Sequence, residues 1–165
     1  MLYASNPRSA CLAAALALAA GVTLAAPRGV EAFDAAAWQA LQAGLKRPAV
    51  VVFSATWCAN CPEVIDDLGA QLRARPLKAD LVSVVMDVAP GEKDAWLLRD
   101  PHYSQSDRLF AFAGAANALR YSVDPRWRGL TPYVFLLAPG KAALAVSGAP
   151  SVAQFEAWAR AAEPR

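Results

Sequence analysis

Charged residues are scarce in this sequence. Only 18% of its 165 residues are Asp, Glu, Lys or Arg, whereas 56% are apolar. The 16 basic and 14 acidic residues are scattered and leave a formal net charge of +2, which excludes the clustered basic face of a nucleic-acid-binding protein. The apolar majority excludes a mostly disordered chain, and the length suits one hydrophobic core. The sequence therefore predicts a single globular domain with no nucleic-acid partner.

Cysteine and histidine are rarer still. Three cysteines are too few to hold a scaffold together by disulfides. A closed zinc site takes four ligands, and the only histidine is His102. The sequence predicts no resident metal ion.

A long apolar run lies near the start of the sequence. Residues 11–26 carry no charge, and the residues before them carry one basic side chain, Arg8, and no acid. This run is shorter than the roughly 20 residues of a membrane span but suits a secretory signal peptide. We expect residues 1–32 to be that signal, cut before Phe33 or earlier after Ala25, or else an uncleaved membrane anchor. Cys11 would be removed with the signal, and residues 33–165 would form the mature domain.

The mature chain would hold one pair of cysteines, Cys58 and Cys61. An exported protein meets an oxidising compartment, in which thiols tend to pair. The loop that a disulfide between these two residues closes is too small to hold distant parts of a fold together. The pair therefore suits a redox-active disulfide better than a structural one.

The rest of the sequence alternates between helical and strand patterns. The helical segments have apolar residues three or four positions apart, and the strand segments are unbroken apolar runs typical of burial on both faces. The expected elements are a helix over 33–47, a strand over 49–53, a helix over 59–75, a strand over 81–86, a helix over 107–119, strands over 132–137 and 142–146 joined by a turn at 138–141, and a last helix after Ser151, with Val152, Phe155 and Ala159 buried. This order predicts an α/β domain with a four-stranded mixed sheet flanked by helices.

One segment exceeds what this scheme needs. Between Asp87 and Thr131 lie 43 residues, of which a crossing helix takes about 15. We therefore expect residues 88–106 to be an irregular insertion between the second and third strands, either functional or a covering flap.

The two cysteines follow directly on the first buried strand. A strand that passes into a helix here places Cys58 at the helix N-terminus, where free amide N–H groups and the helix dipole stabilise a thiolate. A thiolate in such a place is a nucleophile, and Cys61, one turn further on, would be more buried. We expect Cys58 to attack a substrate disulfide and Cys61 to resolve the mixed disulfide.

This segment resembles the active site of thioredoxin-fold proteins. The likeness lies in Phe53-Ser54-Ala55-Thr56-Trp57-Cys58-Ala59-Asn60-Cys61 and in Thr131-Pro132 at the start of the third strand. It implies a thioredoxin-like fold over residues 34–162, with a redox-active Cys58–Cys61 disulfide and no other cofactor. It also implies that Pro132 is a cis proline which, with Thr131 and Trp57, binds the substrate chain.

The export signal and the insertion resemble the exported TlpA-like branch of that family. This resemblance implies a periplasmic, monomeric thiol-disulfide oxidoreductase that acts on protein thiols and disulfides. It favours a reductant whose dithiol is restored by a membrane electron donor.

Two positions depart from the family pattern. Thioredoxin has a buried acid six residues before its first cysteine, where this chain has Val52, and some TlpA-like reductases have an acid three residues after the second cysteine, where it has Val64. The residues between the cysteines, Ala59 and Asn60, match neither thioredoxin nor strong oxidants. The redox direction therefore stays open.

Two other functions remain possible from the sequence. Cys58, Cys61 and His102 could form a soft three-ligand site of a copper(I)-delivery protein. Alternatively, the region near Pro132 could belong to a redox-silent module that binds extended peptides. Trp96, Tyr103 and Trp127 could line a substrate groove or pack in the core.

Overall fold

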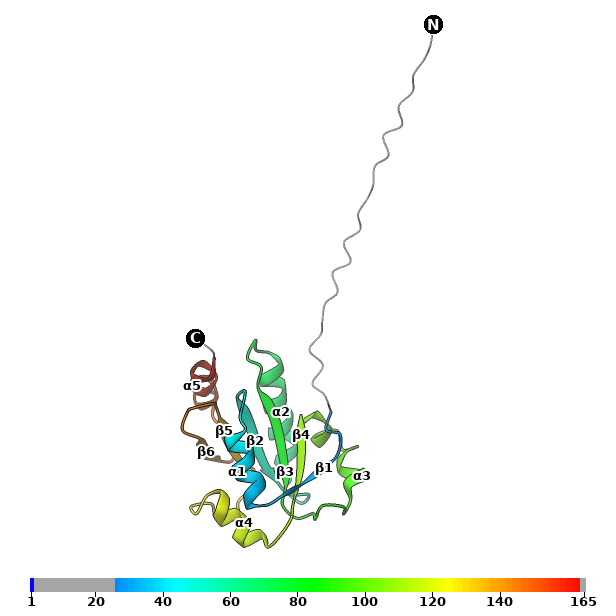
Figure 1. The fold of residues 1–165 in the computed structure, drawn as a ribbon, viewed down its shortest axis with the longest axis vertical. Helices are drawn as coiled ribbons and strands as arrows, with labels where there is room; N and C mark the ends of the chain where they lie inside the picture. Colours follow the sequence, from blue (N-terminus) through cyan, green and yellow to red (C-terminus); the bar gives the residue numbers. More distant parts are fainter. Residues whose placement is uncertain (2–25, 164–165) are drawn as a thin grey trace.

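The computed structural model describes residues 1 and 26–163 (Figure 1). Its elements, in chain order, are β1 (Val30–Phe33), α1 (Ala35–Ala43), β2 (Ala49–Ser54), α2 (Cys61–Arg73), β3 (Asp80–Val85), α3 (Asp94–Leu97), the 3-10 turn η1 (Tyr103–Gln105), β4 (Arg108–Phe112), α4 (Ala116–Val123), β5 (Tyr133–Leu137), β6 (Leu144–Ser147) and α5 (Val152–Ala162). Cys11 and most of the apolar run lie outside the described residues. None of the helices found in the described part is long and apolar enough to cross a membrane.

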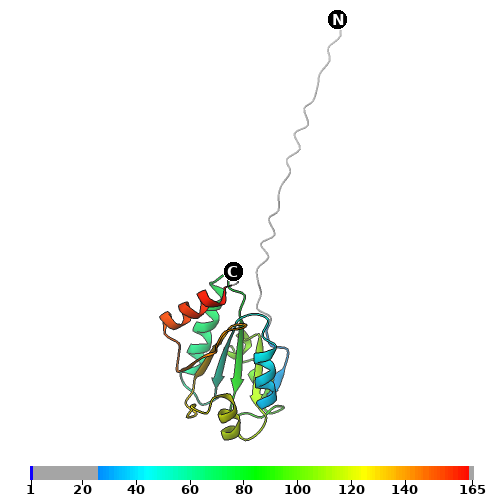
Figure 2. The same cartoon turned by 60° about the vertical axis from the view of Figure 1, so that its left-hand side comes forward.

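The strands form one mixed sheet in the order β1-β4-β3-β2-β5-β6. The first four of these run parallel to one another, and β5 and β6 complete the sheet as antiparallel strands. Figures 1 and 2 show the sheet between two layers of helices. The predicted mixed sheet flanked by helices is therefore confirmed, but the prediction of four strands is wrong, because the sheet has six.

The two additional strands are β1 and β4. Residues 108–112 were expected in a helix because Leu109 and Phe112 are three positions apart, yet they are extended, and four of the five are buried. Gly114 follows with a φ of +143°, a conformation that no helix residue adopts, so α4 begins only at Ala116. All four residues of β1 pair with β4. The sequence predicted the end of the signal peptide and the start of a helix at these residues.

The other expected elements are present, with small shifts of their ends. Asp34 caps α1 by accepting a hydrogen bond from the N–H of Ala37 at 2.7 Å, as its position predicted. Ser151 caps α5 in a reciprocal capping box with Gln154. The prediction of the buried face of α5 is wrong at one position, because Val152 is 74% exposed and Trp158 lies in the core instead.

The hydrophobic core has two parts, one on each face of the sheet. Side chains of α2 and α5 pack on one face and those of α1 and α4 on the other. Alternate residues of β2 point to opposite faces, so Val50 and Val52 belong to the first part and Val51 and Phe53 to the second. The fully buried β2 is thus fixed from both sides, and the chain that leaves its end starts from a rigid position.

The segment 88–106 is an insertion between the second and third predicted strands, as expected, but it has secondary structure of its own. It contains α3 and η1, and its Leu97 and Tyr103 side chains are buried in the core. His102 and Gln105 both bind the carboxylate of Asp66 on α2, with 2.9 Å between His102 Nδ1 and Asp66 Oδ2. Apolar burial and these polar contacts together fasten the segment to α2.

Candidate active site

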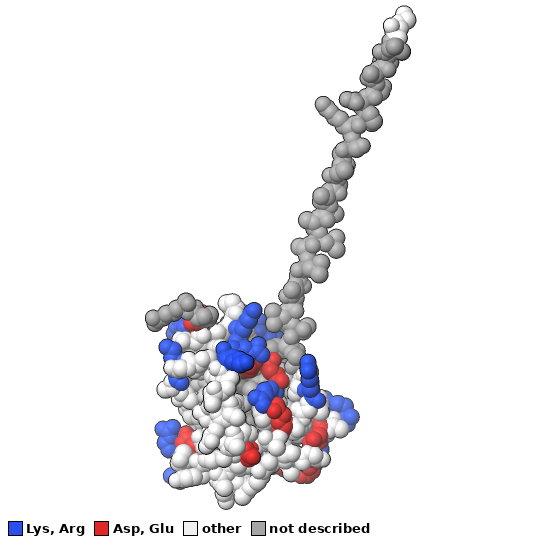
Figure 3. Space-filling model, viewed as in Figure 1, with Lys and Arg blue, Asp and Glu red and all other residues white. Residues whose placement is uncertain are grey.

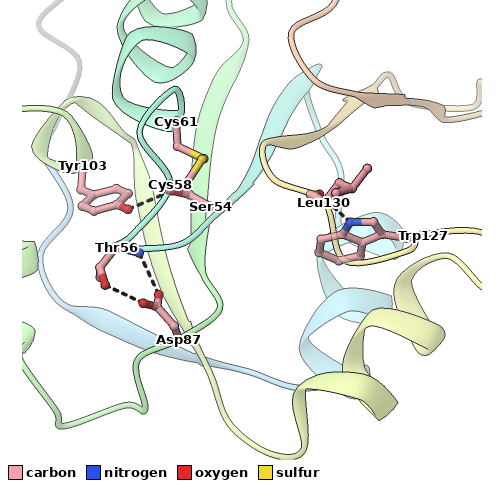
Figure 4. The surroundings of a disulfide bond; sticks show 8 residues. All are labelled: Ser54, Thr56, Cys58, Cys61, Asp87, Tyr103, Trp127 and Leu130. Atoms are coloured by element: carbon pink, nitrogen blue, oxygen red, sulfur yellow. Dashed lines mark hydrogen bonds between the residues drawn. A yellow bond between two sulfur atoms is a disulfide. The ribbon is translucent and has the colours of Figure 1, made fainter.

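Cys58 and Cys61 form a disulfide beyond the end of β2 (Figure 4). The helix begins later than predicted: Cys61 is the first residue of α2, and Cys58 lies in the turn before it. That turn is closed by the Cys58 N–H, which donates to the Ala55 carbonyl at 3.0 Å, and by the Cys61 N–H, which donates to the Cys58 carbonyl at 3.3 Å. The bond to Cys61 therefore holds the Cys58 sulfur beside the first turn of α2, although Cys58 is not itself helical.

The two cysteines differ in their exposure. The Cys58 residue is 8% exposed and Cys61 is fully buried, whereas Trp57 is 68% exposed. Cys58 is therefore the more accessible partner, although less open than its place in the sequence suggested.

A cis peptide bond joins Thr131 to Pro132. The next residue, Tyr133, pairs with Phe53 of β2, so Pro132 lies beside the end of the strand that leads to Cys58. The Thr131 hydroxyl oxygen is buried and has no hydrogen-bond partner within the described part of the chain. The sheet register thus brings Thr131 and Pro132 to the end of the sheet that holds the disulfide.

The loop before Thr131 is fixed by Trp127. Its indole N–H donates to the Leu130 carbonyl at 2.8 Å, as Figure 4 shows, and its ring stacks on Tyr133 with 4.7 Å between centroids. Leu130 itself is 67% exposed. Of the two roles left open by the sequence, packing is the one that Trp127 has here, and it holds this loop.

Two hydrogen-bonded pairs support the chain between β2 and Cys58. The hydroxyls of Ser54 and Tyr103 are 2.8 Å apart, and both residues are buried. The N–H and hydroxyl of Thr56 donate to the two carboxylate oxygens of Asp87, at 2.9 and 2.5 Å. Figure 4 shows both pairs close to the disulfide, with Tyr103 contributed by the segment 88–106. Burial raises the pKa of Tyr103, which keeps its hydroxyl neutral.

A buried carboxylate lies on the Pro132 side of the site. Asp124 accepts hydrogen bonds from the Arg126 guanidinium and backbone N–H and from the Tyr133 hydroxyl, at 2.9 to 3.1 Å. These bonds, those from Arg126 first, lower the pKa of Asp124 to about 2. Burial, followed by the hydrogen bond to Asp124, raises the pKa of Tyr133 to about 12. Asp124 therefore stays ionised and ties the loop before Thr131 to β5.

No family model and no curated protein matches the sequence. Solved structures do match the fold. MTB DsbF, described in mixed oxidized and reduced forms, is 18% identical with a TM-score of 0.51, and the match covers 74% of this chain and 85% of that one. The thioredoxin-related protein from Neisseria meningitidis serogroup B is also 18% identical, with a TM-score of 0.50 over 73% of this chain and 88% of the other. This chain has a thioredoxin fold. The fold class predicted from the sequence is confirmed.

The thioredoxin fold brings together most of the predicted site residues, but not His102. Cys58, Cys61, Trp57 and the Thr131-Pro132 bond all lie at the same end of the sheet. His102 instead contacts Asp66, and within residues 26–163 no three His, Cys, Asp or Glu side chains gather as a metal site would require. In this structure the histidine of the alternative copper site is thus paired with a carboxylate of α2.

The positions of the two missing acids are filled by the core of the thioredoxin fold. Val52 is fully buried and Val64 nearly so, both in the part of the core under α2. Sequence reasoning missed Ser54, Thr56 and Asp87 as supports of the site. Their partners are 31 and 49 positions apart, so no local spacing could have indicated them.

Proposed function

We propose that this chain is an exported thiol-disulfide oxidoreductase that acts on protein substrates. The observation that supports this most is the disulfide between closely spaced cysteines beside the Thr131-Pro132 bond of a thioredoxin fold. A disulfide across so short a loop contributes little to the stability of a fold, whereas it suits reversible opening and closing. The accessibility of Cys58 relative to Cys61 gives the two sulfurs different roles.

The reduced protein begins the reaction. The Cys58 thiolate attacks one sulfur of a substrate disulfide, that bond breaks, and the released substrate sulfur leaves as a thiolate that takes up a proton. The Cys61 thiolate then attacks the Cys58 sulfur, the mixed disulfide breaks, and the second substrate thiol leaves. Two electrons have passed to the substrate, and the protein ends with the Cys58–Cys61 disulfide. A membrane electron donor returns two electrons and restores the dithiol.

The substrate chain binds between Trp57 and the Thr131-Pro132 bond. Trp57 and Leu130 are large apolar side chains with about two thirds of their surface exposed, at 68% and 67%. Pro132 has no N–H, so the backbone of Thr131 is the group that pairs with an extended substrate. Exposed apolar side chains beside a reactive sulfur favour unfolded or extended protein substrates over small thiols.

Export and redox direction rest on the sequence. The apolar run at 11–26 supports export to the periplasm, and the resemblance to TlpA-like proteins supports a monomeric reductant. The reduction potential of the Cys58–Cys61 pair tests the redox direction, because a thioredoxin-type reductant has a potential of about −270 mV and a strong oxidant one of about −120 mV.

The function is tested by insulin reduction and by trapping of the mixed disulfide, both in a Cys11→Ser background so that only the site cysteines remain. We expect Cys58→Ser to abolish reduction and Cys61→Ser to accumulate a disulfide between Cys58 and the substrate, seen as a higher-mass species that dithiothreitol removes. A Cys58→Ser protein that still reduces insulin, or a Cys61→Ser protein that traps no substrate, would contradict the proposal.

A further inference from the structure

The end of the sheet opposite the disulfide carries an open hollow of about 930 Å³. β1, β2, β3 and β4 are parallel and start at this end, and β5 finishes there, with Leu137 opposite Ala49. The hollow is lined by five basic side chains and one acidic one, which are Lys46, Arg47, Lys78, Lys141, Arg160 and Glu163. Figure 3 shows Lys and Arg side chains gathered toward the upper end of the face in view. We call these five basic residues the basic end of the domain.

The three lysines of the basic end are available to a ligand. Lys46, Lys78 and Lys141 are exposed, and within the described residues none of them has an ion-pair partner. Arg47 differs, because it pairs with Asp80. A ligand that carries negative charge would therefore meet three ammonium groups that make no ion pair among the described residues, in a lining with one acid, Glu163.

The wall of the hollow between these cations is apolar. Pro48, Pro76, Leu77 and Pro139 all contribute to it. A ligand that fits both features carries an anionic group joined to an apolar body. The headgroup of an anionic phospholipid has this chemistry.

The described chain also enters the domain at this end. β1 starts at Val30, which pairs with Leu109 near the start of β4. The apolar run of the sequence ends at Ala26, and the four residues to Val30 span at most about 14 Å. While that run is attached, as a signal or as an anchor, Val30 lies within this reach of any bilayer that holds the run, and it starts β1 at the same end of the sheet as the basic end.

We propose that the basic end binds the anionic surface of a membrane, with a lipid phosphate in the hollow. Charge complementarity and the short connection to the apolar run both favour this occupant. The disulfide lies at the other end of the sheet, so this contact turns Cys58 away from the bilayer and toward soluble substrates. This contact involves no redox chemistry, so the membrane proposal and the proposed function are tested independently of each other.

Lysine footprinting of the full chain in vesicles tests this contact. The sequence has four lysines, and the fourth, Lys93, lies just before α3 and outside the basic end, so it serves as an internal control. Lysines are reductively methylated with formaldehyde and dimethylamine borane, both neutral reagents, in phosphatidylcholine vesicles and in vesicles with about 30% phosphatidylglycerol, and mass spectrometry gives the extent at each lysine. We expect Lys46, Lys78 and Lys141 to react at least about threefold more slowly, relative to Lys93, in the anionic vesicles. Salt near about 1 M should remove the difference.

Charge reversal supplies a matched pair of variants. Lys78→Glu should weaken the protection of Lys46 and Lys141 relative to Lys93. Arg128→Glu, at an exposed residue of the loop before Thr131, at the other end of the sheet, should leave that protection unchanged. Equal lysine reactivity in both kinds of vesicle would overturn the proposal. Equal protection by soluble glycerol phosphate added to phosphatidylcholine vesicles would also overturn it, because the hollow would then be a site for a free anion.

Discussion

At the scale of single residues, the chain that carries Cys58 depends on buried hydrogen bonds. Ser54 and Tyr103 share one such bond at 2.8 Å beneath the disulfide. Tyr103→Phe keeps the ring but leaves the Ser54 hydroxyl buried without this partner, which should lower the free energy of unfolding by about 1 to 2 kcal/mol. Urea unfolding of the oxidised protein measures this change. Tyr121→Phe, at a residue that is 69% exposed, is the matched control and should change it by less than about 0.5 kcal/mol. Equal stability of the two variants would contradict the supporting role of Tyr103.

Asp124 should make stability depend on pH in the acid range. Hydrogen bonds, mainly from Arg126, lower its folded-state pKa from 3.8 to about 2. The resulting stabilisation is complete above the unfolded-state pKa and is lost as the pH falls through the folded-state value. Since Arg126 is itself exposed, we expect about 1 to 2 kcal/mol to be lost between about pH 4 and pH 2.

Unfolding measured across this range checks the contribution of Asp124. The Asp124→Asn variant should lose less stability than the parent between these pH values. Asp67→Asn, at an exposed carboxylate on α2, should follow the parent. A parent and an Asp124→Asn protein with the same pH dependence would show that Asp124 contributes nothing to it.

At the scale of elements, β1 makes the stability of the mature chain depend on where the signal is cut. A cut before Phe33 removes three of the four β1 residues and their pairing with β4, whereas a cut after Ala25 leaves the strand whole. The Glu31–Arg108 ion pair, which is also lost, is about half exposed and contributes little. The free energy of unfolding of a chain that starts at Phe33 should therefore be about 1 to 3 kcal/mol lower than that of a chain that starts at Ala26. The loss comes chiefly from the backbone hydrogen bonds between β1 and β4. Urea unfolding of the two chains measures this, and equal midpoints would contradict it.

Elements with an uninterrupted pattern could be predicted from the sequence, and short ones with mixed patterns could not. β2 is an apolar β-branched run bounded by Pro48, and it lies where predicted. β4 has only five residues, and its apolar spacing also fits a helix, so periodicity alone gave the wrong answer. Gly114, just after it, was the local signal that a helix could not continue. β1 was missed because residues 30–32 were assigned to the signal and Phe33 to the helix after it.

The residues of the candidate site also divide into those that the sequence could predict and those that it could not. Cys58, Cys61 and Thr131-Pro132 belong to short motifs, and each could be named from the sequence. The Ser54–Tyr103 and Thr56–Asp87 pairs form only when β2, β3 and the segment 88–106 meet in the folded chain. His102 belongs to the second group as well, because the sequence left its copper role only as an alternative, and its contact with Asp66 forms only in the folded chain.

At the scale of the whole molecule, the two ends of the sheet have different chemistry. One end holds the disulfide and exposed apolar side chains, and the other holds the basic end. The parallel strands impose this separation, because each begins at one end and finishes at the other. A protein built in this way can present its sulfurs to substrates while its opposite end contacts another surface.

The central claim is that Cys58 is a nucleophilic thiolate stabilised by the first turn of α2. The rate of iodoacetamide alkylation of the reduced protein, in the Cys11→Ser background, tests this most directly between about pH 4 and pH 10, with peptide mass spectrometry to assign the modified residue. We expect Cys58 to be alkylated first, with a midpoint well below the value of about 8.5 for a free thiol. A midpoint at or above about 8.5, or faster alkylation of Cys61, would contradict the claim.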